Sequence, residues 1–178
     1  SGDSVRLHRL KTGRSDASPF YFGRRRMLDA REFFERESPG GALDLRRSLA
    51  PHLASLRRPG KGILISDLLI PIEEFQAGVN LLRAAKLDLL VIQTLGPQEL
   101  APAASGVERL VDAESGQESD LRFDDRGRAI YLQNLTRHRR DLRSFCHRAG
   151  VQYAFYDTSS DLEDFVLTEL PALGLLRE

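Results

Sequence analysis

Three runs of consecutive hydrophobic residues stand out along the chain, each bounded by glycine, proline or charged residues. They occupy positions 62–69, 87–95 and 151–156. A strand that is buried on both faces is hydrophobic at consecutive positions, whereas a strand with one wet face alternates. We therefore predict three buried strands of a parallel sheet, the first of them closed by Ser66 and Asp67.

The segments between these runs carry apolar residues at helical spacing. Leucines recur every three or four positions within residues 43–56, and Pro71 opens a similar pattern that continues to position 85. A longer pattern ends at Gly150, a residue typical of helix C-termini. Helices are predicted for residues 28–37, 43–56, 71–85, 129–149 and 162–176.

Two further segments have the pattern of a β-hairpin, in which two short strand-like stretches are separated by a turn. Residues 5–10 predict a half-buried strand, followed by a turn at 12–16 and a short aromatic strand at 19–23. Residues 107–111 and 120–123 predict a second hairpin with its turn at Gly116. Strands that alternate with helices favour an α/β fold, here a three-layer sandwich with a mostly parallel central sheet. We expect residues 1–178 to form a single domain.

Composition narrows the classes of protein without naming an activity. The 178 residues include 26 Lys and Arg against 26 Asp and Glu, so the formal net charge is zero, which argues against a broadly basic nucleic-acid binder. The single cysteine, Cys146, excludes an internal disulfide. No stretch approaches the roughly 18 consecutive apolar residues of a membrane span, and we expect a cytoplasmic protein without a membrane segment.

Candidate chemistry is sparse. Asp67 follows a buried strand at the sheet end where ligands usually bind, and it could hold a hard cation or cap the following turn. Cys146 lies beside His147 and either has a lowered thiol pKa or, the interpretation we favour, packs inward with Phe145. Asp67 and Cys146 would be the only anchors of a hydrolase, and no base or oxyanion donor accompanies them in the pattern.

The strongest charge feature lies in the predicted helix 129–149. It contains Arg137, Arg139, Arg140 and Arg143, a set that would suit a phosphate backbone. Because the overall charge is balanced, we favour a solvated helix face and keep nucleic-acid or anionic-surface binding as the alternative function.

Four stretches in order carry a family resemblance: residues 41–45, 62–69, 89–100 and 110–116. With their Ser-Asp pair after a strand, their Pro-x-Glu segment and their Asp-x-Glu-x-Gly segment, they resemble the C-terminal portion of the "domain of unknown function 58" family. The resemblance covers residues 2–170. It implies a von Willebrand factor A-like fold, of which this chain is a part that lacks the first strand.

The resemblance also implies a place for a metal ion at the sheet edge. Asp67 matches the aspartate of the third metal-binding loop, Leu43 stands where the second loop has a threonine, and the first loop, Asp-x-Ser-x-Ser, is absent. One certain carboxylate is too few for a hard divalent cation. We therefore treat Asp67 as a vestigial candidate and expect no metal and no cofactor.

Two structural and functional expectations follow from the resemblance. Without the first strand, either the strand 5–10 closes against residues 63–67, or the exposed sheet edge pairs between molecules and gives a homodimer. Members of the family work with MoxR-type AAA+ ATPases, so we expect a non-enzymatic protein-interaction module, an adaptor for such an ATPase.

Overall fold

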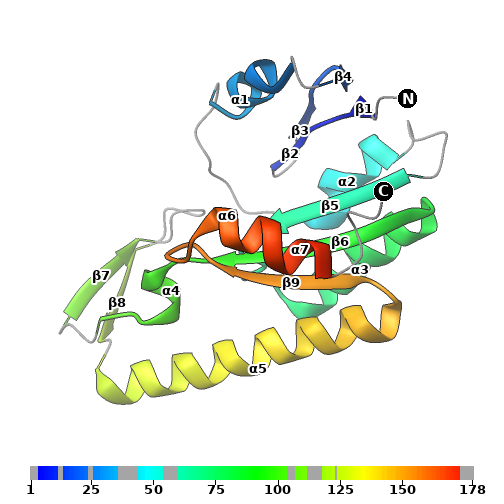
Figure 1. Ribbon diagram of the computed structural model, residues 1–178. Coiled ribbons are helices and arrows are strands. Elements are labelled where there is room, and N and C mark those ends of the chain that lie inside the picture. Colours follow the sequence, from blue (N-terminus) through cyan, green and yellow to red (C-terminus); the bar gives the residue numbers. More distant parts are fainter. Residues whose placement is uncertain are drawn as a thin grey trace.

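Three parallel strands form the centre of the structure, in the order β5–β6–β9 (Figure 1). They are β5 (Gly60–Ser66), β6 (Leu87–Leu95) and β9 (Gln152–Asp157). Both pairs are parallel, with Ile65 opposite Ile92 in the first. This computed structural model describes residues 4–11, 14–23, 26–35, 44–53, 60–103, 107–111, 118–122 and 124–172.

The helices that connect these strands end close to where the sequence indicates, and one of them begins earlier. Helix α3 (Ile72–Ala84) follows Pro71 and joins β5 to β6. Helix α5 (Asp125–Ala149) leads into β9, and it begins four residues earlier than predicted because the Asp124 carboxylate accepts a hydrogen bond from the Gly127 N–H. It ends at Gly150, whose φ of 66° is readily adopted only by glycine.

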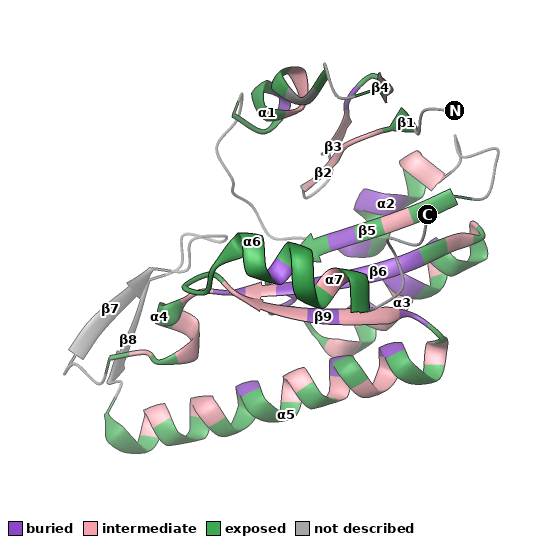
Figure 2. Ribbon diagram, viewed as in Figure 1, coloured by how far each residue is buried: buried purple, intermediate pink, exposed green. Residues whose placement is uncertain are grey.

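Helices cover both faces of the sheet, which confirms the predicted α/β class (Figure 2). On one face, α2 (Leu45–Leu53), α3 and α5 enclose the main core. On the other face, α6 (Leu162–Asp164), the π-helical turn η2 (Phe165–Glu169) and α7 (Leu170–Ala172) lie over a smaller core. The smaller core consists of Leu90, Ile92, Ala154 and Phe165.

The N-terminal residues form a hairpin, but the turn predicted at 12–16 is wrong in extent, because residues 14–16 belong to a strand that pairs with residues 9–11, and each arm of the hairpin is interrupted. Strand β1 (Ser4–Val5) pairs with β4 (Tyr21–Phe22), and β2 (His8–Lys11) pairs with β3 (Arg14–Ala17). Between the two pairs, buried Ser18 donates its backbone N–H to Leu7 O and accepts the Leu7 N–H on its hydroxyl. Helix α1 (Met27–Glu35) follows, and α2 contacts both β2 and β3.

Two expectations for the central sheet are wrong. Strand β5 is not buried on both faces, because Ile63 and Ile65 are 58% and 63% exposed. The strand 5–10 does not close against residues 63–67 either, since within the described residues β5 pairs with β6 alone and β2 with β3. The side chain of Leu64, which points to the opposite face, is buried in the main core.

The remaining elements follow the predicted pattern with shifted ends. Strands β7 (Val107–Val111) and β8 (Glu118–Arg122) are antiparallel, and the turn expected at Gly116 lies outside the described residues. A short helix α4 (Pro97–Leu100) follows β6. The helix predicted for 162–176 is α6, η2 and α7 in succession, and residues beyond 172 are not described. None of the described helices combines the length and apolar composition of a membrane-spanning segment.

Candidate functional site

The loop that leaves β5 lies at the carboxyl end of the parallel sheet, where open α/β sheets usually bind their ligands. Its second residue after the strand, Leu68, is almost completely buried and has a φ of 56°. A left-handed backbone at a leucine costs about 1–2 kcal/mol, so the surroundings must hold this conformation in place. The loop is therefore a candidate functional site.

Asp67 uses its carboxylate within this loop. Its Oδ1 accepts the Leu69 N–H at 3.2 Å and the Ser66 hydroxyl at 3.3 Å, while Ser66 Oγ accepts the Leu68 N–H at 3.1 Å. These bonds are those of an aspartate that caps a turn. Of the two roles that the sequence left open for Asp67, the geometry supports turn capping.

Two side chains from other elements, Gln93 and His138, bond to the loop backbone, and Tyr153 holds Gln93 in place. Gln93 of β6 is fully buried and donates its Nε2 hydrogen to Asp67 O at 2.8 Å, and its Oε1 accepts the Tyr153 hydroxyl at 2.6 Å. His138 of α5 places Nε2 2.7 Å from Leu68 O. Burial raises the pKa of Tyr153, which keeps its hydroxyl protonated as a donor. This network was not predicted from the sequence, although Gln93, a polar residue within the hydrophobic run 87–95, was a signal for it.

Of the two residues that the resemblance maps onto a metal site, the structure describes one. Asp67 is exposed at the sheet end, and Leu43 lies outside the described residues. Within the described residues, no three His, Cys, Asp or Glu side chains gather closely enough to share an ion. Asp157 at the end of β9 also serves its own turn, because bonds from the Ser159 hydroxyl and N–H lower its pKa. That the chain holds no metal stays a prediction.

Cys146 packs inward, as we favoured from the sequence. It is fully buried in the main core, and its neighbour Phe145 meets Phe75 edge to face, with ring centroids 5.8 Å apart. Burial raises the pKa of the Cys146 thiol to about 12. A thiol that stays protonated at neutral pH is not an activated nucleophile, so the neighbouring His147 does not make it reactive.

The arginines of α5 do not form one surface. Arg137, Arg140 and Arg143 are exposed, but the Arg139 guanidinium carbon lies 3.5 Å from the centroid of the Phe155 ring in β9. Arg139 therefore faces the sheet in a cation–π contact. Arg140 has Asp141 at 3.6 Å as an exposed ion pair. Three arginines instead of four remain for an anionic ligand, which weakens the nucleic-acid alternative.

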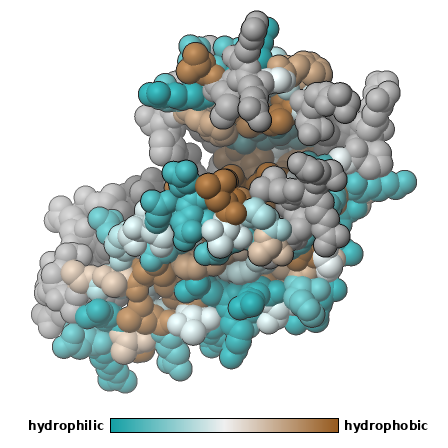
Figure 3. All heavy atoms as spheres, viewed as in Figure 1, coloured by the Kyte–Doolittle hydropathy of each residue, from teal (hydrophilic) through white to brown (hydrophobic). Residues whose placement is uncertain are grey.

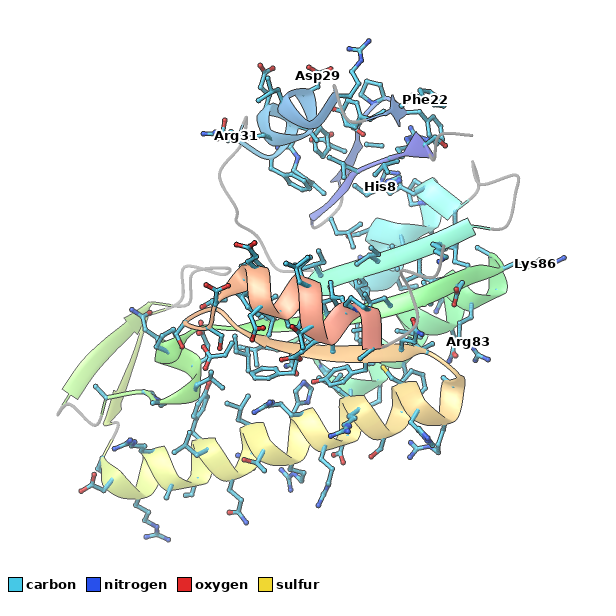
Figure 4. The ribbon with its side chains drawn as sticks, viewed as in Figure 1. His8, Phe22, Asp29, Arg31, Arg83 and Lys86 are labelled. Atoms are coloured by element: carbon cyan, nitrogen blue, oxygen red, sulfur yellow. The ribbon has the colours of Figure 1, made fainter. Side chains whose placement is uncertain are left out.

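A histidine pair joins the N-terminal hairpin to α2. The rings of His8 and His52 meet edge to face, with centroids 4.3 Å apart, and Figure 4 shows His8 on the hairpin side of α2. Burial, His52 and Arg6 lower the pKa of His8 to about 4, and burial also lowers that of His52. No local pattern indicates this pair, because its members lie 44 positions apart (52 − 8).

Comparison with known proteins gives one distant relative. The chain is 28% identical over 128 residues to an uncharacterized protein of Mycobacterium avium, MAV169, and the match covers 70% of this chain and 75% of that protein. No protein-family model matches the chain, and no solved structure matches it.

Proposed function

We propose that this chain is a non-enzymatic protein-interaction module of von Willebrand factor A-like fold that acts as an adaptor for a MoxR-type AAA+ ATPase. The partner class comes from the resemblance in residues 41–45, 62–69, 89–100 and 110–116. The observation that carries an interaction function is the open face of β5.

Apolar side chains are exposed on this face and on the helices beside it. Ile63 and Ile65 project from β5, and Leu162, Val166 and Leu167 project from α6 and η2. Figure 3 shows hydrophobic side chains gathered between the N-terminal hairpin and the C-terminal helices. Soluble proteins rarely expose contiguous apolar surface unless it binds a partner.

The polar groups at the carboxyl end of the sheet support the non-enzymatic part of the proposal. Asp67, Gln93 and Tyr153 hydrogen-bond to the loop backbone or to each other. They fix the loop conformation instead of converging on an open position where a reacting atom would sit.

The proposal is tested by capture of a MoxR-type AAA+ ATPase from the same genome on the immobilised chain. We expect the ATPase to be retained, and we expect Ile65→Lys to reduce the retained amount at least about tenfold, since a charge would have to be desolvated in the contact. The matched control is Ile130→Lys, which places the same charge on an exposed isoleucine of α5. Circular dichroism of both variants verifies folding.

Two results would overturn the proposal. One is no retention of the ATPase by the folded wild-type chain. The other is equal loss with Ile65→Lys and Ile130→Lys, which would mean that general surface hydrophobicity, and not the β5 face, holds the partner.

A further inference from the structure

The positive charge of the chain is concentrated in helix α5. Residues 125–149 contain seven arginines and two aspartates, so the helix carries a formal charge of +5 (7 − 2). The whole chain has 26 basic and 26 acidic residues, so the residues outside α5 carry 19 basic against 24 acidic groups. A surface that gathers one sign of charge is complementary to a partner of the opposite sign.

Four of the seven arginines lie on one line along the outward side of α5, which forms an edge of the molecule in Figure 1. An α-helix turns by about 100° per residue, so these four fall within a sector of about 80°. The buried residues of α5 point the opposite way, toward the sheet. The four are all exposed and we call them the arginine line: Arg126, Arg137, Arg140 and Arg148.

The two central arginines keep hydrogen-bond donors for a ligand. A guanidinium has five N–H donors, and Arg137 uses one of them on Asn134 Oδ1 at 2.9 Å. Arg140 lies 3.6 Å from a carboxylate oxygen of Asp141, which is too far for a hydrogen bond. Both arginines line an open hollow of about 430 Å³ together with Leu132, Gln133 and Thr136. An acidic group that enters this hollow meets two guanidinium groups.

The spacing along the line favours a polypeptide over a phosphate backbone. Between Arg126 and Arg137 the line has no cation for about 16 Å, a length over which one DNA strand presents about five phosphates. Ile130, which is 49% exposed, lies within this gap. A polypeptide can place an apolar side chain between its carboxylates to cover it, whereas a phosphate backbone cannot. One isoleucine is too little apolar surface to enter a bilayer.

We propose that the arginine line of α5 binds an acidic segment of another polypeptide. Carboxylates of that segment pair with Arg137 and Arg140 at the centre, and an apolar side chain covers Ile130. Arginine suits this contact because its planar fork binds a carboxylate through two parallel hydrogen bonds. The contact is separate from the exposed face of β5, because α5 packs on the opposite face of the sheet.

The test uses the 178-residue chain and a fluorescent peptide rich in glutamate, with leucines interspersed. A length of about twenty residues is enough to lie along the arginine line. A second peptide has glutamine in place of every glutamate. By fluorescence anisotropy, we expect the acidic peptide to bind at least about tenfold more tightly than the glutamine peptide. We also expect its binding to weaken as the salt concentration rises.

Variants locate the binding on α5. Arg137→Glu combined with Arg140→Glu should lower affinity for the acidic peptide at least about tenfold, since both attractions become repulsions. Replacing the same two arginines by glutamine should lower it less. The matched control reverses Arg83 and Lys86, two exposed cations that Figure 4 shows pointing outward near the end of α3, and should leave affinity unchanged. Circular dichroism verifies that each variant is folded.

Four results would overturn the proposal. The first is equal binding of the two peptides, or binding of neither, by the folded chain. The second is tighter binding of a labelled DNA duplex that the α5 charge reversal abolishes, which makes nucleic acid the occupant. The third is the same result with vesicles of anionic lipid. The fourth is a homodimer at low salt that the charge reversal dissociates, which makes a second copy the occupant.

This proposal and the proposed function fail separately. The charge reversal on α5 should leave retention of the ATPase unchanged, because that contact is assigned to the other face of the sheet. Binding of the acidic peptide without retention of the ATPase contradicts only the proposed function.

Discussion

Strands β5 and β6 are neighbours and both are rich in hydrophobic residues, yet one face of β5 is exposed whereas β6 is buried on both faces. Ile65 and Ile92 face each other in register on the same side of the sheet, and they are 63% and 6% exposed. The same holds for Ile63 and Leu90. The difference arises because β6 has strands on both sides and helices on both faces, whereas β5 has a described strand on one side only. A run of hydrophobic residues thus predicts a strand that can be buried on both faces, but it does not predict whether neighbouring elements cover both faces.

The strongest test of this comparison is one substitution made in both strands. Ile92→Ala should lower the free energy of unfolding by about 2–5 kcal/mol, since it leaves a cavity in the smaller core. Ile65→Ala should cost less than about 1 kcal/mol because the side chain is largely exposed. Urea unfolding of both variants measures the difference. Equal losses would mean that the open face of β5 is covered in solution.

The next test concerns Gln93 of β6, which lies opposite Ser66 of β5 and holds the loop that follows β5. Gln93→Leu keeps the volume but removes both hydrogen bonds, leaving Asp67 O and the Tyr153 hydroxyl without their partner. We expect a loss of about 2–3 kcal/mol in urea unfolding. Gln133→Leu, on the exposed side of α5, is the control and should change stability little. A loss below about 0.5 kcal/mol for Gln93→Leu would contradict the role of the network.

Acidification should destabilise the contact between the N-terminal hairpin and α2, where His8 meets His52. The folded chain keeps His8 neutral, with a pKa of about 4 against an ordinary 6.5. The free energy of unfolding is therefore highest above pH 6.5, where His8 is neutral in both the folded and the unfolded chain. It falls as the pH drops from 6.5 toward 4, because only the unfolded chain then protonates His8. After allowance for partial exposure, we expect His8 to cost about 1 kcal/mol at pH 5. The unfolding free energy of His8→Asn should fall less between pH 7 and 5 than that of the wild type.

A matched variant controls this measurement. Gln133 is exposed on α5 and has no titratable group, so Gln133→Asn should keep the pH dependence of the wild type. If His8→Asn and the wild type lose the same stability between pH 7 and 5, the histidine pair does not link the hairpin to α2 in the way described.

The smallest expected effect comes from replacing the lysine near the start of each strand by glycine. Lys86 precedes β6 with a φ of 59°, so Lys86→Gly relieves a left-handed lysine and should raise stability by about 0.5–1 kcal/mol. Lys61 lies within β5 in ordinary strand geometry, and Lys61→Gly should lower stability by a similar amount. Thermal unfolding distinguishes the signs, and two changes of the same sign would refute this account of Lys86.

Local periodicity predicted the elements better than it predicted their surroundings. The helix after Pro71 and the strand 87–95 are confirmed, because spacing and end signals act over a few residues. The edge position of β5 could not be predicted, since strand order depends on contacts between distant segments. The loop network has the same origin: Gln93 and His138 reach backbone groups 26 and 70 positions away.

The π-helical turn η2 has a consequence for how related chains are to be aligned. The Leu170 N–H bonds to Phe165 O five residues back, which amounts to one residue inserted into an α-helix, and both Phe165 and Leu170 pack on the smaller core. Deleting one residue between them would restore the four-residue spacing of a regular α-helix, which also keeps both side chains on the face that packs on the sheet. In evolutionary terms the turn is an insertion that its own packing maintains. A homologue with a regular helix here should show a gap of a single residue between the two core positions, with apolar residues kept at both.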